Sequence, residues 1–194
     1  MRAIRLVAPL VLLAGLGGCF GGSKVPPTLL TLTPQAAAPA ELVRSAAAAQ
    51  AVTIDVPIIP EELDQVRVPA LERPGAITYI EDLQWVDRPN RMFQQLLTET
   101  VKRTTTRVVL DPRQSVLDPG LRVSGTLQRM GYDVASGQVI VIYDAALSTA
   151  GGSRVETRRF QASTPADGTA ATVGPALNQA ANQVALQVAG WVGG

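Results

Sequence analysis

The stretch LRVSGTLQRMGYDVASGQVIVIYDAALS, residues 121–148, contains the clearest strand pattern of the chain. Residues 121–132 alternate apolar and polar side chains, as a half-buried strand does. Ser136-Gly137 is a turn signal, and a second strand is expected over residues 138–149. Val139 to Ile142 are apolar in succession, which predicts a central strand covered on both faces. The stretch therefore predicts two long antiparallel strands joined by a tight turn.

A third strand is expected directly after this pair. Ala150-Gly151-Gly152 predicts a turn, and residues 153–163 have the composition of a strand. This segment carries Arg154, Glu156, Arg158 and Arg159. Charged side chains of this kind are typical of the solvated or edge strand of a sheet. The three strands form a predicted antiparallel meander with the charged strand at its edge.

The first clear helix is predicted upstream of the meander, over residues 89–104. Pro89 is tolerated in the first turn, where its missing N–H has no helical partner. One stripe of the helix is apolar and predicts a face packed on the core, made by Phe93, Leu96, Leu97, Thr100 and Val101. Trp85 lies just before this helix and has two interpretations. It is a core residue whose indole N–H bonds to the backbone, or an aromatic contact with a partner.

The last helix is predicted over residues 175–192, with an apolar face and an opposite face that carries no charge. The uncharged face consists of Asn178, Gln179, Asn182, Gln183 and Gln187. Two interpretations stay open, a surface helix of unusual composition or a subunit interface, because interfaces are depleted of charged residues. Together these elements predict a single α+β domain over residues 52–194. It has a mostly antiparallel mixed sheet and two main helices.

The N-terminal 18 residues have the order of a secretory signal. Arg2 and Arg5 precede an apolar run that is shorter than the ~20 residues a membrane-spanning helix needs. The run ends in Leu16-Gly17-Gly18-Cys19, which resembles the bacterial lipobox, whose cysteine is acylated. We therefore expect a signal peptide over residues 1–18 and acyl chains on Cys19. Several acyl chains would hold the protein on a bilayer essentially permanently.

Residues 19–51 are expected to form an acylated tether and a flexible linker rich in Ala and Pro. Within it, Thr28 to Thr33 is a short Thr/Leu segment of high strand propensity, which suits an edge strand recruited by a sheet. In the enterobacterial sorting rule an Asp after the acylated Cys retains a lipoprotein at the inner membrane. Because Phe20 stands there instead, we expect the periplasmic face of the outer membrane.

Composition argues against several functional classes. The chain has no His, a single Cys and a net charge of +1. We therefore expect no nucleic-acid partner, no metal, no cofactor and no catalytic residue set. The catalytic alternative is an envelope hydrolase with a Ser/Lys dyad. It would need Lys24 or Lys102 beside one of Ser115, Ser124, Ser136, Ser148, Ser153 and Ser163.

The order of these features resembles the ABC-type transport auxiliary lipoprotein family. The lipobox is followed by a Thr/Leu strand after Pro26-Pro27, an Ala/Pro linker and the strand Val52-Thr53-Ile54-Asp55-Val56-Pro57. Next come Leu63-Asp64 and then Gln84-Trp85-Val86-Asp87-Arg88-Pro89, which opens a helix. The strands and an Ala-rich C-terminal helix complete the order. The resemblance covers essentially the whole chain.

The resemblance implies a non-catalytic outer-membrane subunit that works with an ABC permease and ATPase and with an MCE-domain protein carrying phospholipid between membranes. The charge-poor helix adds the expectation of a homo-oligomeric ring. Partner contacts are expected at Trp85, Asn178, Asn182, Gln183 and Gln187. The alternative function is a pilotin-like or assembly-factor lipoprotein of another outer-membrane complex.

Overall fold

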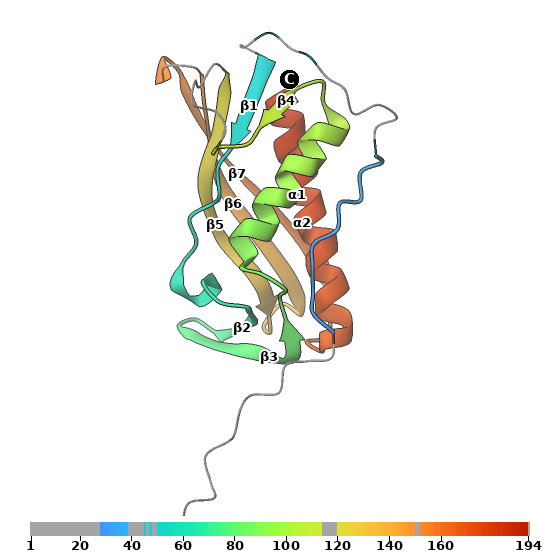
Figure 1. Cartoon of the computed structure of the whole chain (residues 1–194). Helices are drawn as coiled ribbons and strands as arrows, with labels where there is room; N and C mark the ends of the chain where they lie inside the picture. Colours follow the sequence, from blue (N-terminus) through green and yellow to red (C-terminus); the bar gives the residue numbers. More distant parts are fainter. Residues whose placement is uncertain are drawn as a thin grey trace, which may run out of the picture.

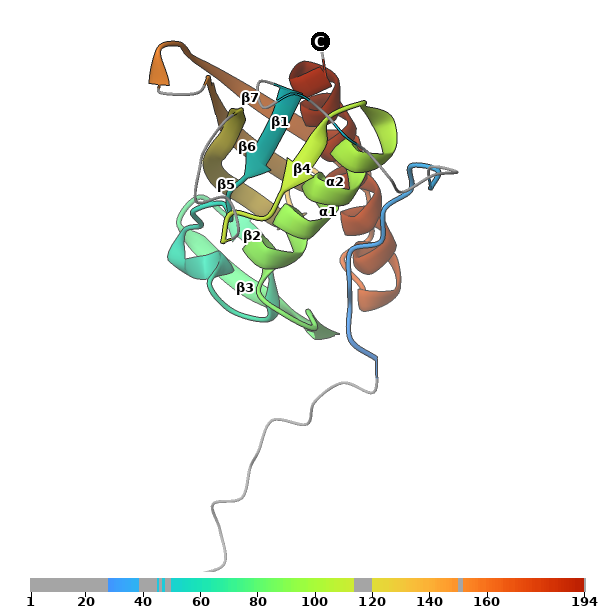
Figure 2. The ribbon, with the colours of Figure 1, turned by 45° about the horizontal axis from the view of Figure 1, so that its top comes forward.

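The computed structural model describes residues 28–38, 45, 47, 50–113, 120–149 and 152–193. The signal peptide, Cys19 and most of the linker lie outside the described residues. The described chain forms one seven-stranded mixed sheet with two long helices packed on one of its faces (Figure 1). This confirms the predicted α+β class. Turned by 45°, the molecule shows the helical layer in front of the sheet (Figure 2).

The predicted meander is present. It consists of β5 (Leu121–Asp133), β6 (Gln138–Ser148) and β7 (Val155–Pro165), paired antiparallel along their full lengths. The other strands are β1 (Ala51–Ile54), β2 (Arg67–Arg73), β3 (Ala76–Gln84) and β4 (Val108–Leu110). A 3-10 turn, η2 (Glu61–Leu63), interrupts the chain between β1 and β2.

Strand β5 organises the sheet because its two edges are used differently. One edge pairs with β6 throughout. Along the other edge of β5 two strands pair with it in parallel. Strand β1 pairs with the start of β5, and strand β2 pairs with the end of β5. Between them Ile58 bridges to Thr126, so the same segment follows β5 almost continuously. Strand β4 extends the sheet beyond β1, and β3 extends it beyond β2.

The prediction that β6 is covered on both faces is wrong. Val139 and Val141 are fully buried under the helices, whereas Ile140 and Ile142 on the other face are only half-buried. That face of the sheet carries ion pairs instead of a second layer, including Arg122 with Asp55 and Arg159 with Asp144. Side-chain stems and neighbouring strands shield the two isoleucines without a covering element.

Helix α1 (Pro89–Thr104) has the predicted bounds and buries the predicted stripe. Helix α2 (Ala170–Gly193) begins five residues earlier than expected, so Pro175 lies inside it. Asp167 explains the earlier start, because its Oδ1 accepts hydrogen bonds from the Thr169 N–H and from the hydroxyls of Thr169 and Thr172. These bonds help to satisfy the first turn of a helix.

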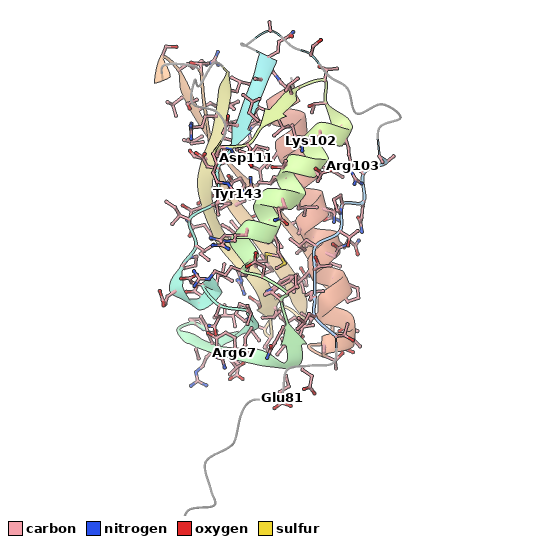
Figure 3. All side chains as sticks on the ribbon, in the orientation of Figure 1. Arg67, Glu81, Lys102, Arg103, Asp111 and Tyr143 are labelled. Carbon is pink, nitrogen blue, oxygen red and sulfur yellow. The ribbon has the colours of Figure 1, made fainter. Side chains whose placement is uncertain are left out.

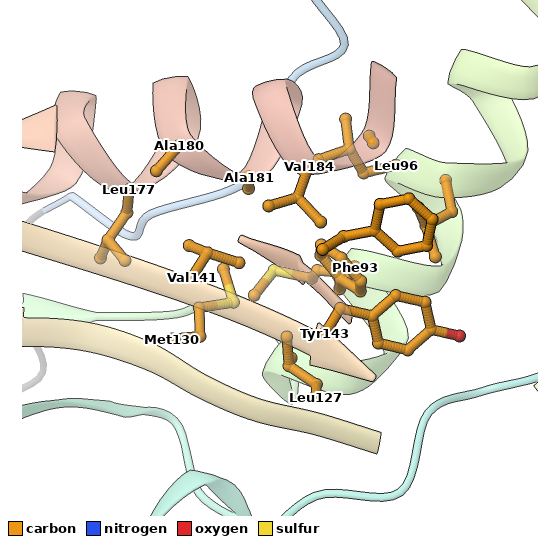
Figure 4. Close-up of a cluster of buried hydrophobic side chains, with 14 of the residues drawn as sticks. Phe93, Leu96, Leu127, Met130, Val141, Tyr143, Leu177, Ala180, Ala181 and Val184 are labelled. Carbon is orange, nitrogen blue, oxygen red and sulfur yellow. The ribbon is translucent and has the colours of Figure 1, made fainter. Parts of the chain in front are cut away.

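The core lies between the helices and the buried face of β5 and β6 (Figure 4). At its centre Phe93 of α1 meets Tyr143 of β6 edge-on, with ring centroids 5.3 Å apart. On the α2 side small residues such as Ala180 and Ala181 face the sheet and let the helix approach it closely. Both helices therefore keep a fixed position over the sheet, with α2 presenting its remaining faces to α1 and to the N-terminal segment.

Candidate functional site

The N-terminal segment lies against the domain rather than apart from it. We call residues 28–38 the strap. Its Leu30 forms a parallel bridge with Trp85, in which the Leu30 N–H donates to Gln84 O (2.8 Å) and the Val86 N–H donates to Leu30 O (2.9 Å). The Thr/Leu segment thus joins the sheet at only one residue, and its continuation runs along the helices (Figure 1).

Two asparagines of α2 hold the backbone of the strap. Asn178 Oδ1 accepts from the Thr33 N–H at 2.8 Å. Asn182 Oδ1 accepts from the Gln35 N–H (2.8 Å), and its Nδ2 donates to Thr33 O (2.9 Å). An amide side chain offers its donor and its acceptor on two separate atoms, so it can bond to an N–H and a C=O of an extended backbone at once. This explains why the predicted uncharged face of α2 contains Asn where a solvated helix would carry Lys and Glu.

Helix α1 holds the far end of the strap. Arg103 Nη1 donates to Ala36 O at 2.9 Å, so the strap crosses both helices. The segment predicted as a flexible linker from Gln35 onward therefore starts with residues that are hydrogen-bonded to the domain. The boundary between linker and domain at residues 51 and 52 stays a prediction.

Trp85 lies beneath the start of the strap and is only 1% exposed. This burial agrees with the first interpretation, in which the Trp85 ring is a core residue. The expectation that its indole N–H bonds to the backbone is wrong, because Nε1 is buried without a hydrogen-bond partner among the described residues. A direct contact between Trp85 and a partner stays a prediction, and it would require the strap end of the domain to open.

The other predicted contact residues divide into two groups. Asn182 is 2% exposed and Asn178 half-buried, and both already bind the strap. Gln183 is exposed, and the exposed Gln187 donates from Nε2 to Gln161 O at 3.3 Å. Contacts of these four residues with a partner stay predictions. Cys19 lies outside the described residues, so its acylation also stays a prediction.

A cleft of about 380 Å³ lies at the opposite end of α2 from the start of the strap. Leu121, Leu147 and Val192 contribute apolar atoms to it. Trp191, Arg107 and Arg154 contribute aromatic and cationic groups, and Glu156 an acidic one. The Trp191 indole N–H donates to Glu156 Oε1 at 2.8 Å. Thr149 completes the lining. The composition suits recognition of an apolar group that carries charge.

Of the two lysines in the hydrolase alternative, the structure describes Lys102, which is paired with an acidic side chain. Lys102 Nζ contacts Glu99 Oε1 at 3.3 Å rather than a serine hydroxyl. Tyr143 is fully buried, and burial followed by the charge of Asp55 raises the pKa of its hydroxyl, which stays protonated. Within the described ranges, acidic, His and Cys side chains form no cluster of three that could hold a metal ion. No described helix has both the length and the apolar character needed to cross a membrane.

Solved structures share this fold. The crystal structure of protein XCC0632 from Xanthomonas campestris, assigned to family model DUF330, superposes with a TM-score of 0.71 at 18% identity, covering 86% of this chain and 94% of that one. An uncharacterised protein of known structure gives a TM-score of 0.63 at 11% identity, covering 77% of this chain and 96% of that one. At these identities the likeness shows the fold alone. No curated protein matches the sequence.

The fold and the strap define a class, that of a two-layer α+β domain whose N-terminal segment is fastened across its helices. The sequence specifies the family. Residues 30–189 match the model of the ABC-type transport auxiliary lipoprotein component, and the chain belongs to that family. The match begins at Leu30, so it includes the residues of the strap that bind Trp85, Asn178 and Asn182. The family was predicted from the order of short motifs, and the prediction is confirmed.

Proposed function

We propose that this protein is a non-catalytic outer-membrane lipoprotein subunit of an MCE-type intermembrane phospholipid transport system. In this proposal acyl chains on Cys19 hold the chain on the periplasmic face of the outer membrane. The folded domain serves as a docking platform for the MCE-domain protein, which works with an ABC permease and ATPase. The observation that carries the proposal is the family match over residues 30–189, which describes an auxiliary lipoprotein of ABC transport.

The structure supports a mechanical role within this proposal. A tether transmits position only if its attachment to the domain is fixed. Thr33 and Gln35 are attached by backbone hydrogen bonds to α2, and Ala36 to α1. Leu30, bridged to Trp85, is the hydrogen-bonded residue of the strap nearest to residue 19, and the bonds of Thr33, Gln35 and Ala36 hold the strap behind it. The anchor then limits the orientation of the domain as well as its distance from the bilayer.

Anchoring is tested by labelling cells with radioactive palmitate and fractionating their membranes. Wild-type protein is expected to carry label and to fractionate with the outer membrane. Cys19→Ala is expected to lose both the label and the membrane association. A wild-type protein without lipid, or one found with the inner membrane, would contradict the corresponding part of the proposal.

Partner binding is tested by co-purifying the domain lacking its signal with the MCE-domain protein of the same system, followed by mass measurement. The proposal includes a ring of subunits formed through the exposed residues of the uncharged face, Gln179, Gln183 and Gln187, with Leu186 beside them. Leu186 is 46% exposed, an unusual position for a large apolar side chain on a polar face. A strict monomer in the complex would remove the ring, and failure to co-purify would remove the MCE partner.

A further inference from the structure

The cleft beside Trp191 has the composition of a protein-binding site. Trp191 is half-buried, with its indole N–H fixed by Glu156. The Arg158 guanidinium lies 5.8 Å from the Trp191 ring centroid and 6.0 Å from that of Phe160. Tryptophan and arginine are the residue types most enriched where truncation costs an interface most. Here they are held in place before any partner binds, which lowers the entropic cost of binding.

Arg154, which lines the cleft, and Arg158, which lies on the Trp191 ring, are ion-paired with Glu156 and still have N–H groups open to a further carboxylate. Arg154 and Arg158 lie 3.9 Å and 3.8 Å from the nearest Glu156 oxygens, too far for hydrogen bonds. Their side chains are 79% and 54% exposed. Glu156 already accepts a short hydrogen bond from Trp191. A carboxylate from outside could therefore bond to either guanidinium without displacing an existing hydrogen bond to Glu156.

The two ends of the domain carry different charged side chains. Figure 3 labels Lys102 and Arg103 toward the end with the cleft, and Arg67 and Glu81 at the end where the strap starts. Near the start of the strap acidic residues predominate among the described side chains, including Glu61, Glu62, Asp64, Glu72, Glu81 and Asp82. Near the cleft basic residues predominate, including Lys102, Arg103, Arg107, Arg154 and Arg158. Such a field attracts an acidic partner to the cleft end and disfavours a second copy approaching through the same end.

The cleft and the start of the strap lie at opposite ends of α2. Leu30 packs near Gly174 in the first turns of α2, and Trp191 lies near the end of the same helix. At the rise of an α-helix these positions are separated by about 26 Å. The strap starts at the acidic end, so Leu30, its hydrogen-bonded residue nearest to residue 19 in sequence, lies at the opposite end from the cleft (Figure 1). A protein partner fits this geometry better than the bilayer that holds the anchor.

We propose that this cleft docks a protein loop carrying an apolar side chain beside a carboxylate. The apolar side chain packs on Leu121 and Leu147, and the carboxylate binds the guanidinium of Arg158 beside Trp191. The inference uses the proposed function only for the anchor at Cys19. It stands whether or not the partner is the MCE-domain protein.

The test is photo-crosslinking of the full, anchored chain in its own cells. A photoreactive phenylalanine derivative is placed at position 154, at the rim of the cleft, or at position 73 in the β2–β3 turn at the opposite end. We expect a discrete protein adduct from position 154 only. Mass spectrometry of the crosslinked peptide is expected to find an Asp or Glu adjacent to an apolar residue.

Charge variants in the position-154 background separate recognition from proximity. Arg158→Glu is expected to lower the adduct yield about tenfold, whereas Arg158→Lys retains most of it because the positive charge remains. Arg73→Glu is the matched reversal at the other end and should change the yield less than about twofold. Near-ultraviolet circular dichroism of each purified variant checks that the surroundings of Trp191 keep their structure.

The outcomes distinguish this inference from the proposed function. An adduct with the MCE-domain protein supports both, and an adduct of the expected chemistry with another protein supports the cleft and removes the MCE partner. The inference is overturned by an adduct with lipid or with a second copy, by equal adducts from positions 73 and 154, or by no adduct. Loss of the adduct in Arg158→Lys as well as in Arg158→Glu also overturns it, because charge would then not be what is recognised.

Discussion

The two tryptophans lie at opposite ends of the helical layer, and they differ in burial and in the hydrogen bonding of the indole N–H. Trp85 is 1% exposed, lies beneath the start of the strap and leaves its indole N–H without a partner among the described residues. Trp191 is half-buried at the rim of a cleft, with its N–H bonded to Glu156. The comparison shows that the protein covers one end with its own N-terminal segment and leaves the other end uncovered in the described structure.

The largest expected effect tests whether Trp85 belongs to the core. Trp85→Ala removes a fully buried ring next to the helical layer and should lower the free energy of unfolding by about 3–5 kcal/mol. Trp191→Ala removes a half-buried ring and should cost about 1–2 kcal/mol, since less apolar surface returns to water. Denaturant unfolding of the two variants measures the difference. Equal losses would end the distinction between a covered and an uncovered tryptophan.

A second test addresses the strap that covers Trp85. Asn182→Ala leaves the Gln35 N–H and Thr33 O without their side-chain partner, which should lower the free energy of unfolding by about 1–3 kcal/mol. The more specific result is local. Amide hydrogen exchange of residues 30–36 should accelerate while exchange in the strands of the meander stays slow.

Gln183 provides the matched control for this test. It is the next residue of α2, it is exposed, and it lies outside the contact with the strap. Gln183→Ala should change neither the stability nor the exchange rates of residues 30–36. If Asn182→Ala leaves exchange in the strap unchanged, then the asparagines do not hold the strap and the account of the uncharged face is wrong.

The elements predicted best are those whose signal is local. The helix of Pro89–Thr104 and the three strands of the meander follow from periodicity and from turns a few residues long. The parallel pairing of β1 and β2 with β5 was not predicted, because it joins segments more than 60 residues apart and leaves no periodic trace in either. The apolar run in β6 led to the wrong prediction that both faces are covered, because apolar side chains also occur on a sheet face that is only partly shielded.

Of the functional features, the cleft could not be predicted and the contact with the strap only in part. Leu121, Leu147 and Trp191 are brought together by the fold and are distant in sequence. The uncharged face of α2 was noticed, but an absence of charge does not distinguish a second subunit from the chain's own N-terminus. The more specific signal is the pair Asn178 and Asn182, one helical turn apart, which suits an extended backbone.

The smallest effect concerns how helix α2 starts, since the position of its first turns sets where Gly174 and Asn178 meet the strap. Hydrogen bonds from Thr172 and then Thr169 lower the pKa of Asp167 to about 2 from an ordinary value near 3.8. Because the folded-state pKa lies below the unfolded one, the stabilisation is present above about pH 4 and is lost as the pH falls through 2. Asp167→Asn should therefore unfold at a lower temperature than wild type at pH 7, and the gap should narrow between pH 4 and pH 2. Asp111→Asn is the control, since Arg113 lowers the pKa of that carboxylate at a place far from α2 in the sequence. A gap for Asp167→Asn that is the same at pH 7 and pH 2 would show that the ionised carboxylate does not stabilise the start of α2.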